Sequence, residues 1–347
     1  MKIAVDAMGG DFAPEQIVKG AAWAAKRYGC EIVLVGDRTQ IQTQLEKYYP
    51  EWKNSEDSKI TIHHASDIIG MGEHPGVAVR RKKDSSIVVA TRLVKDGECD
   101  AVVSAGNTGA AAASALFVLG RIKGIDRPTI ATPIPTAKGG ATLLLDSGAN
   151  VDCKPKHLLQ SALMGSIYAK CVLGKQNPTV GLLNIGEEAT KGNEQAQQTY
   201  PLLKAMKTIN FQGNAEGRDI PSGNFDVVVC DGFVGNIVLK FAEGLAKTLV
   251  KMAKDAVKNG GILAKIGALL LMPALKKMGK EIDVTEYGGA PLLGVNGCCI
   301  ISHGSSNAKS ICNAIRQACE YVKKDVLTQI RDNIDKEEIL SHDTEIK

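Results

Sequence analysis

Short apolar segments alternate along the chain with longer amphipathic ones. The apolar segments are mostly three or four residues of valine, isoleucine, leucine and alanine, and several are continuously hydrophobic, as strands buried on both faces are. The longer segments place apolar residues at helical spacing with polar residues between them. This alternation predicts a mainly parallel sheet with helices on both faces. The predicted strands are 3–5, 32–35, 60–62, 101–103, 143–145, 180–183 and 227–229, and the predicted helices include 15–28, 85–95, 156–173 and 194–206.

One region breaks the alternation, because two helical patterns follow each other there without a strand between them. The first places Phe241, Leu245 and Leu249 on one stripe, and a Gly-Gly pair ends it. The second contains the run ILAKIGALLLMPALKKM, which is rich in leucine and interspersed with lysine. Two helices separated by glycines predict a hairpin that projects from the sheet. The predicted divisions are a single α/β catalytic domain at 1–330, the hairpin within it at 235–280, and a polar tail at 331–347.

Composition narrows the class of partner. Aromatic residues make up 4% of the 347 residues, too few for a surface on which nucleic-acid bases stack, and the net charge of +4 is small, so we expect no nucleic-acid partner. The nine cysteines show no CxxC pair and no Cys/His ligand spacing, so neither a disulfide framework nor a metal site is predicted. No apolar run reaches the length of a membrane span, and Asp6 stands where a signal peptide would be apolar, which favours the cytoplasm.

Five loops rich in glycine, asparagine and aspartate follow apolar segments and open predicted helices. They are DAMGGD at 6–11, SAGNTGA at 104–110, NIGEEATKGNE at 184–194, DGFVGN at 231–236 and SHGSSN at 302–307. Because parallel strands end at one edge of a sheet, backbone N–H groups and the positive ends of helix dipoles would face one crevice there. This arrangement favours a small anionic ligand over turn geometry alone. The candidate phosphate- or substrate-binding residues are Asp6, Gly9, Gly10, Ser104, Gly106, Asn107, Thr108, Gly109, Asn184, Asp231, Gly232, His303, Gly304 and Ser305.

Several well-known site patterns are absent from these loops. They contain neither GxGxxG nor GxxxxGK[ST], so the nucleotide fingerprints are missing, and no GxSxG elbow occurs. His303 is the only histidine in them, and a lone histidine is more often a structural hydrogen-bonding residue. Asp6, Asp11 and Asp231 suggest metal binding, but aspartates at strand ends more commonly cap turns and helices. Lys191 differs, because it lies in a glycine-bounded loop where a cation could neutralise an anion, although a single lysine is usually a solvated surface residue.

At these loops the chain resembles the bacterial phosphate acyltransferases, the acyl-carrier-protein:phosphate transacylases of phospholipid synthesis. The resemblance runs from about Lys2 to Leu327 and rests on motifs in the family's order: DAMGGDFAP, SAGNTGA, GRIKGIDRP, LLLDSGAN, LLNIGEEATKGNE, DGFVGN and SHGSS. Phe12 stands where many members carry a histidine, which weakens any proposal of a catalytic histidine there. The resemblance implies a three-layer αβα sandwich, related to phosphate acetyltransferases and isocitrate/isopropylmalate dehydrogenases, and usually a homodimer.

The resemblance also implies a reaction that uses no cofactor. Inorganic phosphate reacts with the fatty acyl thioester of acyl carrier protein to give acyl phosphate, which a membrane acyltransferase then uses to acylate glycerol 3-phosphate. The family's functional residues match Lys191 and Asn236. We expect Lys191 to offset phosphate charge and Asn236 to donate to the carbonyl oxygen as it becomes tetrahedral. Because phosphate supplies the attacking oxygen, the lack of a Ser-His-Asp triad agrees with this chemistry.

The leucine-rich run at 262–278 fits the same context, because acyl phosphate is amphiphilic and its next enzyme lies in the membrane. One face of this helix would lie on lipid while lysines approach anionic headgroups, so that the protein binds the membrane peripherally. The alternative is that the hairpin packs against its copy in a dimer, and both remain open. Pro273 is expected to end or kink the helix. The predicted lipid-facing residues are Leu263, Ile266, Leu269 and Leu270, and the lysines are Lys265, Lys276 and Lys277.

The partner surfaces and three other functions stay open at this stage. An acidic carrier protein could dock on the basic run at 80–83 or on Arg121 with Lys123. A short-chain phosphate acetyltransferase using coenzyme A would differ in its donor. An NAD- and metal-dependent dehydrogenase of the same fold would need clustered metal-binding aspartates and an arginine-rich substrate site, neither of which the sequence shows. A non-catalytic membrane scaffold would leave the five loops unexplained.

Overall fold

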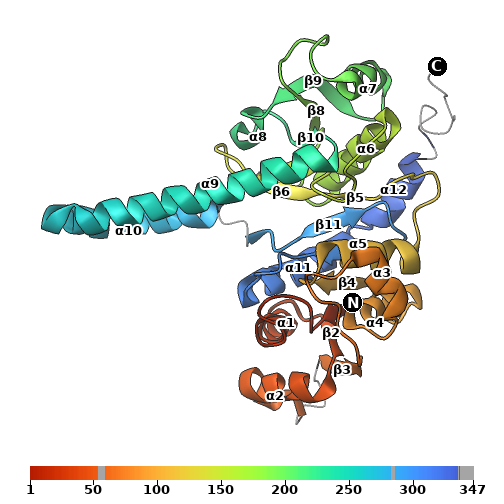
Figure 1. Cartoon of the computed structure of the whole chain (residues 1–347), viewed down its shortest axis with the longest axis vertical. Helices are drawn as coiled ribbons and strands as arrows, with labels where there is room; N and C mark the ends of the chain where they lie inside the picture. Colours follow the sequence, from red (N-terminus) through yellow and green to blue (C-terminus); the bar gives the residue numbers. More distant parts are fainter. Residues whose placement is uncertain (54–58, 283–285, 335, 337–347) are drawn as a thin grey trace.

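The computed structural model describes residues 1–53, 59–282, 286–334 and 336, with the backbone alone for 53, 276–278 and 280–282. Two mostly parallel sheets form the body, each with helices on both faces, and a long helical hairpin projects from it (Figure 1). The lobe of the smaller sheet lies at the top of the view and that of the larger sheet lies below.

The larger sheet has seven strands. In spatial order they are β3 (Ile60–His64), β2 (Glu31–Gly36), β1 (Lys2–Asp6), β4 (Ala101–Ser104), β12 (Cys298–Ile301), β11 (Ala290–Leu293) and β5 (Thr129–Ile130). Only β11 runs antiparallel to its neighbours. One face is covered by α1 (Glu15–Tyr28), α2 (Arg38–Tyr48) and α11 (Ala308–Lys323), and the other by α3 (Pro75–Arg81), α4 (Ser86–Lys95), α5 (Thr108–Ser114) and the π-helical turn η2 (Ala115–Leu119).

Alternation along the strands explains the two helical layers. Ile3 and Val5 belong to the core shared with α1 and α11, whereas Ala4 between them packs with α4 and α5. Successive side chains of a strand point to opposite faces, so a strand that is apolar at every position needs cover on both sides.

The smaller sheet has five strands. Their order is β6 (Thr132–Pro135), β7 (Ala141–Leu145), β10 (Val227–Val229), β8 (Thr179–Asn184) and β9 (Asn210–Glu216), and only β6 is antiparallel. Helices α6 (Pro155–Cys171) and α7 (Glu194–Ala205) cover one face, and α12 (Val326–Ile334) packs on α6. The other face lies under α8 (Asp219–Ser222) and the first turns of α9 (Gly232–Asn259).

The predicted α/β class, the helices on both faces and the projecting hairpin are confirmed, but there are two sheets rather than one. The chain leaves the larger sheet at β5 and enters the smaller one at β6, with only Ala131 between them. Five strands escaped prediction because they lack a long apolar run: β5, β11 and β12 have only two to four residues, β6 contains Pro133 and Pro135, and β9 reads NFQGNAE.

The hairpin consists of α9 and α10 (Gly261–Ile282), which run out from the body and back (Figure 1). Helix α9 has 28 residues and is about 42 Å long at 1.5 Å per residue. Only its Gly232 and Gly235 are buried, so most of the helix extends beyond the sheets. Of the two predicted effects of Pro273, ending the second helix is wrong, because α10 continues past it, and a kink there stays a prediction. Of the predicted polar tail, 331–334 ends α12 and almost all of the rest lies outside the described residues.

Candidate active site

Three of the predicted loops meet at the carboxyl edge of the larger sheet. Strands β1, β4 and β12 are parallel neighbours there, and the loops DAMGGD, SAGNTGA and SHGSSN follow them. The Asp11 amide donates to the Gly304 carbonyl (2.8 Å). Gly10 has φ +115°, and a Cβ atom there would lie 3.1 Å from the Ala105 carbonyl oxygen and 3.2 Å from that of Gly304. Three backbones therefore pack together closely enough to require glycine at position 10.

Asp6 ends β1 inside this cluster with 2% of its surface exposed. Its carboxylate accepts hydrogen bonds from Ser104 Oγ (2.7 Å) and the Met8 amide (3.3 Å), and Ser104 Oγ accepts one from the Gly106 amide (3.1 Å). Burial raises the pKa of the Asp6 carboxyl, against the lowering effect of its hydrogen bonds. The adjoining cavity is about 10 Å³, the size of one water and smaller than a phosphate ion. Gly9 lets the loops approach, since a Cβ there would lie 2.4 Å from Asp6 Oδ2.

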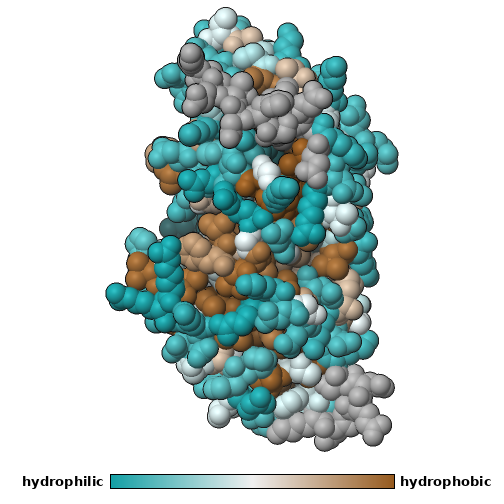
Figure 2. Space-filling view, turned by 90° about the vertical axis from the view of Figure 1, so that its right-hand side faces the viewer, coloured by the Kyte–Doolittle hydropathy of each residue, from teal (hydrophilic) through white to brown (hydrophobic). Residues whose placement is uncertain are grey.

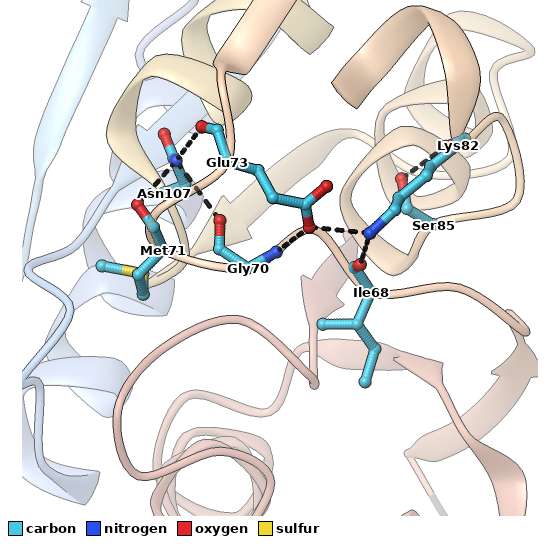
Figure 3. A network of polar contacts seen from close by, with 7 residues as sticks. All are labelled: Ile68, Gly70, Met71, Glu73, Lys82, Ser85 and Asn107. Atoms are coloured by element: carbon cyan, nitrogen blue, oxygen red, sulfur yellow. Dashed lines mark hydrogen bonds and ion pairs between the residues drawn. The ribbon is translucent and has the colours of Figure 1, made fainter. Parts of the chain in front are cut away.

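Asn107 ties the start of α5 to the segment before α3 (Figure 3). Its Oδ1 accepts from the Ala110 amide (3.0 Å), and its Nδ2 donates to the carbonyls of Met71 (3.0 Å) and Glu73 (3.1 Å). The Glu73 carboxylate in turn lies 2.7 Å from Lys82 Nζ. The Asn107 amide is thus engaged within the fold, and Lys82, from the basic run at 80–83, is partly engaged as well.

The third loop of this cluster carries the predicted His303. Its Nδ1 accepts from the Ser305 amide (3.1 Å) and lies 2.8 Å from Ser305 Oγ, and the ring is exposed. With Nδ1 as an acceptor, the neutral ring carries its proton on Nε2. Asn307 caps α11 by accepting from the Ser310 amide (3.0 Å).

The DGFVGN loop opens α9 directly against another loop, the DSGAN segment after β7. The Gly232 amide donates to the Asn150 carbonyl (2.7 Å), and a Cβ on Gly235 would lie 1.9 Å from the Asp146 carbonyl oxygen. Both glycines are therefore needed for backbone contact. This contact brings the Asn236 side chain next to Gly148, whose added Cβ would lie 3.5 Å from Asn236 Cγ. The predicted Asp231 caps the helix, accepting from the Val234 amide (2.8 Å).

Asp146 holds the DSGAN segment, and the sequence analysis assigned it no role. It is 1% exposed, and its Oδ1 accepts from the amides of Ile130 (3.1 Å), Gly148 (3.1 Å) and Ala149 (3.0 Å). Its Oδ2 accepts from the Asn150 amide (2.7 Å) and from Asn150 Nδ2 (2.8 Å). A signal was present, because Asp146 directly follows the fully apolar strand β7 and precedes Gly148 by two residues, much as Asp6 and Asp231 stand at strand ends with glycines shortly after them.

The fifth loop places Lys191 at the surface of the smaller lobe. Asn184 organises it, because Asn184 Nδ2 donates to the Lys191 carbonyl (3.0 Å) and Asn184 Oδ1 accepts from the Ile185 amide (2.8 Å). The Lys191 side chain is exposed, and Asn193 begins α7 by accepting from the Ala196 amide (2.9 Å). The loop backbone at Lys191 is thus fixed by hydrogen bonds while the lysine side chain extends into solvent.

A cleft of about 1760 Å³ lies between the two lobes. Thr108 and Gly109 line it from the larger sheet, and 148–150 with Glu194 line it from the smaller. The five loops predicted to share one crevice therefore belong to two groups, one on each sheet, and two of them line this cleft: SAGNTGA through Thr108 and Gly109, and NIGEEATKGNE through Glu194. Asn236 adjoins the cleft through Gly148, and Lys191 precedes Glu194 by three residues.

The cleft is rich in positive charge at the start of α6. His157 Nδ1 accepts from the Lys154 amide (3.1 Å), so its neutral form is the one that closes this turn. Burial lowers the pKa of His157 below its usual 6.5, and the charges of Arg127, Lys154 and Lys156 act in the same direction against Asp126. This end of the cleft therefore favours negatively charged ligand groups.

The described part of the chain offers neither a metal site nor a membrane-spanning helix. No group of three or more His, Cys, Asp or Glu side chains is placed to hold a metal ion among these residues. No helix in the described ranges is both long and apolar enough to cross a membrane.

Comparison with known proteins identifies relatives over nearly the whole chain. The model of the family described as fatty acid synthesis protein matches residues 1–329. A phosphate acyltransferase of Pelotomaculum thermopropionicum is 57% identical over 339 residues, covering 98% of this chain and 96% of the relative. A phosphate acyltransferase of Aquifex aeolicus is 53% identical over 325 residues and covers 94% of each chain.

Solved structures of lower identity share the fold. A phosphotransacetylase from Streptococcus pyogenes superposes with a TM-score of 0.61 at 17% identity, covering 92% of this chain and 94% of its own. The EutD phosphotransacetylase from Staphylococcus aureus gives a TM-score of 0.59 at 16% identity with the same coverage. The two-lobed arrangement of sheets is therefore an established architecture.

Proposed function

The chain belongs to the fatty acid synthesis protein family and is an acyltransferase, and we propose that it transfers a fatty acyl group from acyl carrier protein to inorganic phosphate. The observation that carries the proposal is the identity of 51–57% with phosphate acyltransferases over nearly the full chain. The acyl phosphate formed would serve a membrane enzyme that acylates glycerol 3-phosphate in phospholipid synthesis.

The reaction needs no nucleophile from the protein. A phosphate oxygen attacks the thioester carbonyl carbon, forming a C–O bond and a tetrahedral oxyanion. Collapse of this oxyanion breaks the C–S bond, and the electron pair leaves on sulfur as a thiolate that takes up a proton. The protein must therefore hold phosphate and thioester together and offset negative charge.

Lys191 and Asn236 are the residues we assign to this task. Lys191 offsets the charge of phosphate, and this role is supported by its exposed side chain on a loop whose backbone Asn184 fixes by a hydrogen bond. Asn236 donates to the carbonyl oxygen as it becomes tetrahedral, supported by its position beside Gly148 at the cleft. Backbone amides of the SAGNTGA and SHGSSN loops complete the phosphate site across the cleft.

The hairpin supports a finer proposal about assembly and location. Leu263 and Leu270 of α10 are 80% and 77% exposed, and Ile266 and Leu269 are exposed beside them, as is Phe241 on α9. An exposed apolar patch of this size is typical of a surface that binds another protein or a membrane. We assign the stem near the body to a homodimer contact and the far end, with the exposed Lys265, to lipid. The side chains of Lys276 and Lys277 lie outside the described residues.

The decisive experiment measures phosphate-dependent loss of the palmitoyl thioester of acyl carrier protein, with palmitoyl-coenzyme A and acetyl-coenzyme A in parallel. Acyl phosphate from the carrier-bound donor is the expected product. Preference for acetyl-coenzyme A would instead indicate a phosphate acetyltransferase. No phosphate-dependent product from any donor would overturn the proposal.

A further inference from the structure

The cleft between the lobes has one apolar wall. Ala112, Ala113, Leu116 and Phe117 line it from α5 and η2, as two pairs four residues apart and therefore on one helix face. The first three are half-buried, and Phe117 is 46% exposed. We call these four residues the α5–η2 wall. Figure 2 shows hydrophobic surface gathered at mid-height, where the two lobes meet.

The rest of the lining mixes apolar residues such as Ile130 and Leu292 with six charged residues that carry an excess of positive charge. Lys156 lies 3.4 Å from Asp126, and Arg121 donates to the Asp126 carbonyl, so part of this charge is engaged. The cleft thus offers both apolar and positively charged lining, as an amphiphile with an anionic end requires. The charged residues that line the cleft are Arg121, Arg127, Lys154 and Lys156, with Asp126 and Glu194.

The size of the cleft fits a long chain rather than a small acyl group. Its volume of about 1760 Å³ exceeds the ~300–1,000 Å³ of ordinary small-molecule pockets. From Ala112 to Phe117, five helical steps of about 1.5 Å give roughly 7.5 Å of wall, and the lining that continues back to Thr108 extends this to about 14 Å. Each methylene moved from water onto such a surface favours binding by about fourfold. An acetyl group would use little of this surface.

We propose that the acyl chain of the thioester lies along the α5–η2 wall and that Phe117 determines the preference for long chains; this inference rests on the proposed function. The thioester carbonyl then points toward 148–150, where Asn236 adjoins the cleft. The chain extends toward Phe117 at the far end of the wall. The Arg80 guanidinium lies 4.9 Å from the centroid of the Phe117 ring and holds that ring in place.

The test compares Phe117→Ala with Trp23→Ala, a matched control. Trp23 is 45% exposed, also lies beside a cation (Lys19 Nζ at 5.3 Å), and belongs to α1 on the opposite face of the larger sheet. We expect Phe117→Ala to lower kcat/KM for the palmitoyl thioester of acyl carrier protein about tenfold and for the octanoyl thioester less than threefold, because the shorter chain does not reach the ring. Trp23→Ala should change neither value.

A second measurement keeps this proposal separate from the proposed function. Binding of the fluorescent fatty acid cis-parinarate, which needs no turnover, should weaken at least fivefold in Phe117→Ala and in Phe117→Gln, but not in Trp23→Ala. If the wild type makes no acyl phosphate, the proposed function fails and parinarate binding still decides this inference. Equal palmitoyl-to-octanoyl ratios in wild type and Phe117→Ala, or unchanged parinarate binding, would show that the chain lies elsewhere.

Discussion

Lys191 and Asn236 are the residues that we assign to charge stabilisation: Lys191 is exposed on the smaller lobe, and Asn236 lies beside Gly148, which lines the cleft. Removing either group should take away one electrostatic contact that strengthens in the transition state. We therefore expect Lys191→Ala and Asn236→Ala each to lower turnover at least ~100-fold, with circular dichroism and thermal unfolding unchanged. Steady-state rates with palmitoyl carrier protein measure this, and near-normal turnover in both variants would refute the assignment.

His157 offers a test of its burial at the edge of the cleft, because burial, helped by the nearby positive charges, holds its native pKa below the usual 6.5. Between these two values the unfolded chain binds more protons than the folded one, so stability is complete above about pH 6.5 and falls as the pH decreases toward the native pKa. Urea unfolding at about pH 7.5 and about pH 5.5 should show a smaller acid-induced loss for His157→Gln than for wild type. An equal loss in both proteins would mean that other groups cause it.

At the residue scale, composition and motif order identified the loops but not the job of each side chain. Asp6 and Asn107 were candidates for ligand contact, yet their polar atoms are engaged by neighbouring loops. Asp146 was overlooked, although it accepts five hydrogen bonds. Whether a polar loop residue faces a ligand or another loop depends on contacts across the sheet, which a single sequence does not contain.

At the scale of single elements, the first turn of α9 is the most constrained contact of the site. A Cβ on Gly235 would lie 1.9 Å from the Asp146 carbonyl oxygen, so Gly235→Ala must push α9 away from the DSGAN segment. We expect a loss of about 1–3 kcal/mol of unfolding free energy and a fall in turnover, because Asn236 moves with the helix.

Gly244 provides the control within the same helix. Nothing lies within 4 Å of the position of its Cβ, so Gly244→Ala should leave turnover unchanged and stabilise the protein by up to about 1 kcal/mol through helix propensity. The unfolding free energies of both variants and wild type, measured by chemical denaturation, distinguish the loss of close packing at Gly235 from a general effect of alanine in α9. Equal stability of the two variants would contradict the packing argument.

The elements themselves were largely predictable where hydrophobic periodicity was strong. Helix α1 has the predicted bounds, Glu15–Tyr28, and β10 is the predicted strand at 227–229. Strand β9 was missed because its burial comes from neighbours rather than from its own composition: it pairs with β8 although four of its seven residues are Asn, Gln or Glu. Local pattern indicates a strand only when the strand itself supplies the apolar surface.

At the scale of the whole molecule, the sequence predicted one crevice where the structure has a cleft between two sheets. The break depends on the single residue Ala131 between β5 and β6, each of which is an edge strand of its sheet. No periodicity marks such a crossing. The consequence for the proposed function is that Lys191 and Asn236 belong to the lobe of the smaller sheet and the α5–η2 wall to that of the larger, so that their relative position depends on how the lobes meet.

The exposed hairpin is the part of the molecule that we propose contacts lipid and a second copy. If the far end binds lipid and the stem binds a second copy, charges at the two places should have different effects. The double variant Leu263→Asp with Leu270→Asp should lose flotation with phosphatidylglycerol vesicles while light scattering still gives the mass of two chains, since aspartate in the lipid interface is repelled and poorly solvated. Phe241→Asp in the stem should lower that mass instead. Vesicle binding that survives the double variant would exclude the far end as the lipid contact, and loss of the dimer in it would place the copy interface there.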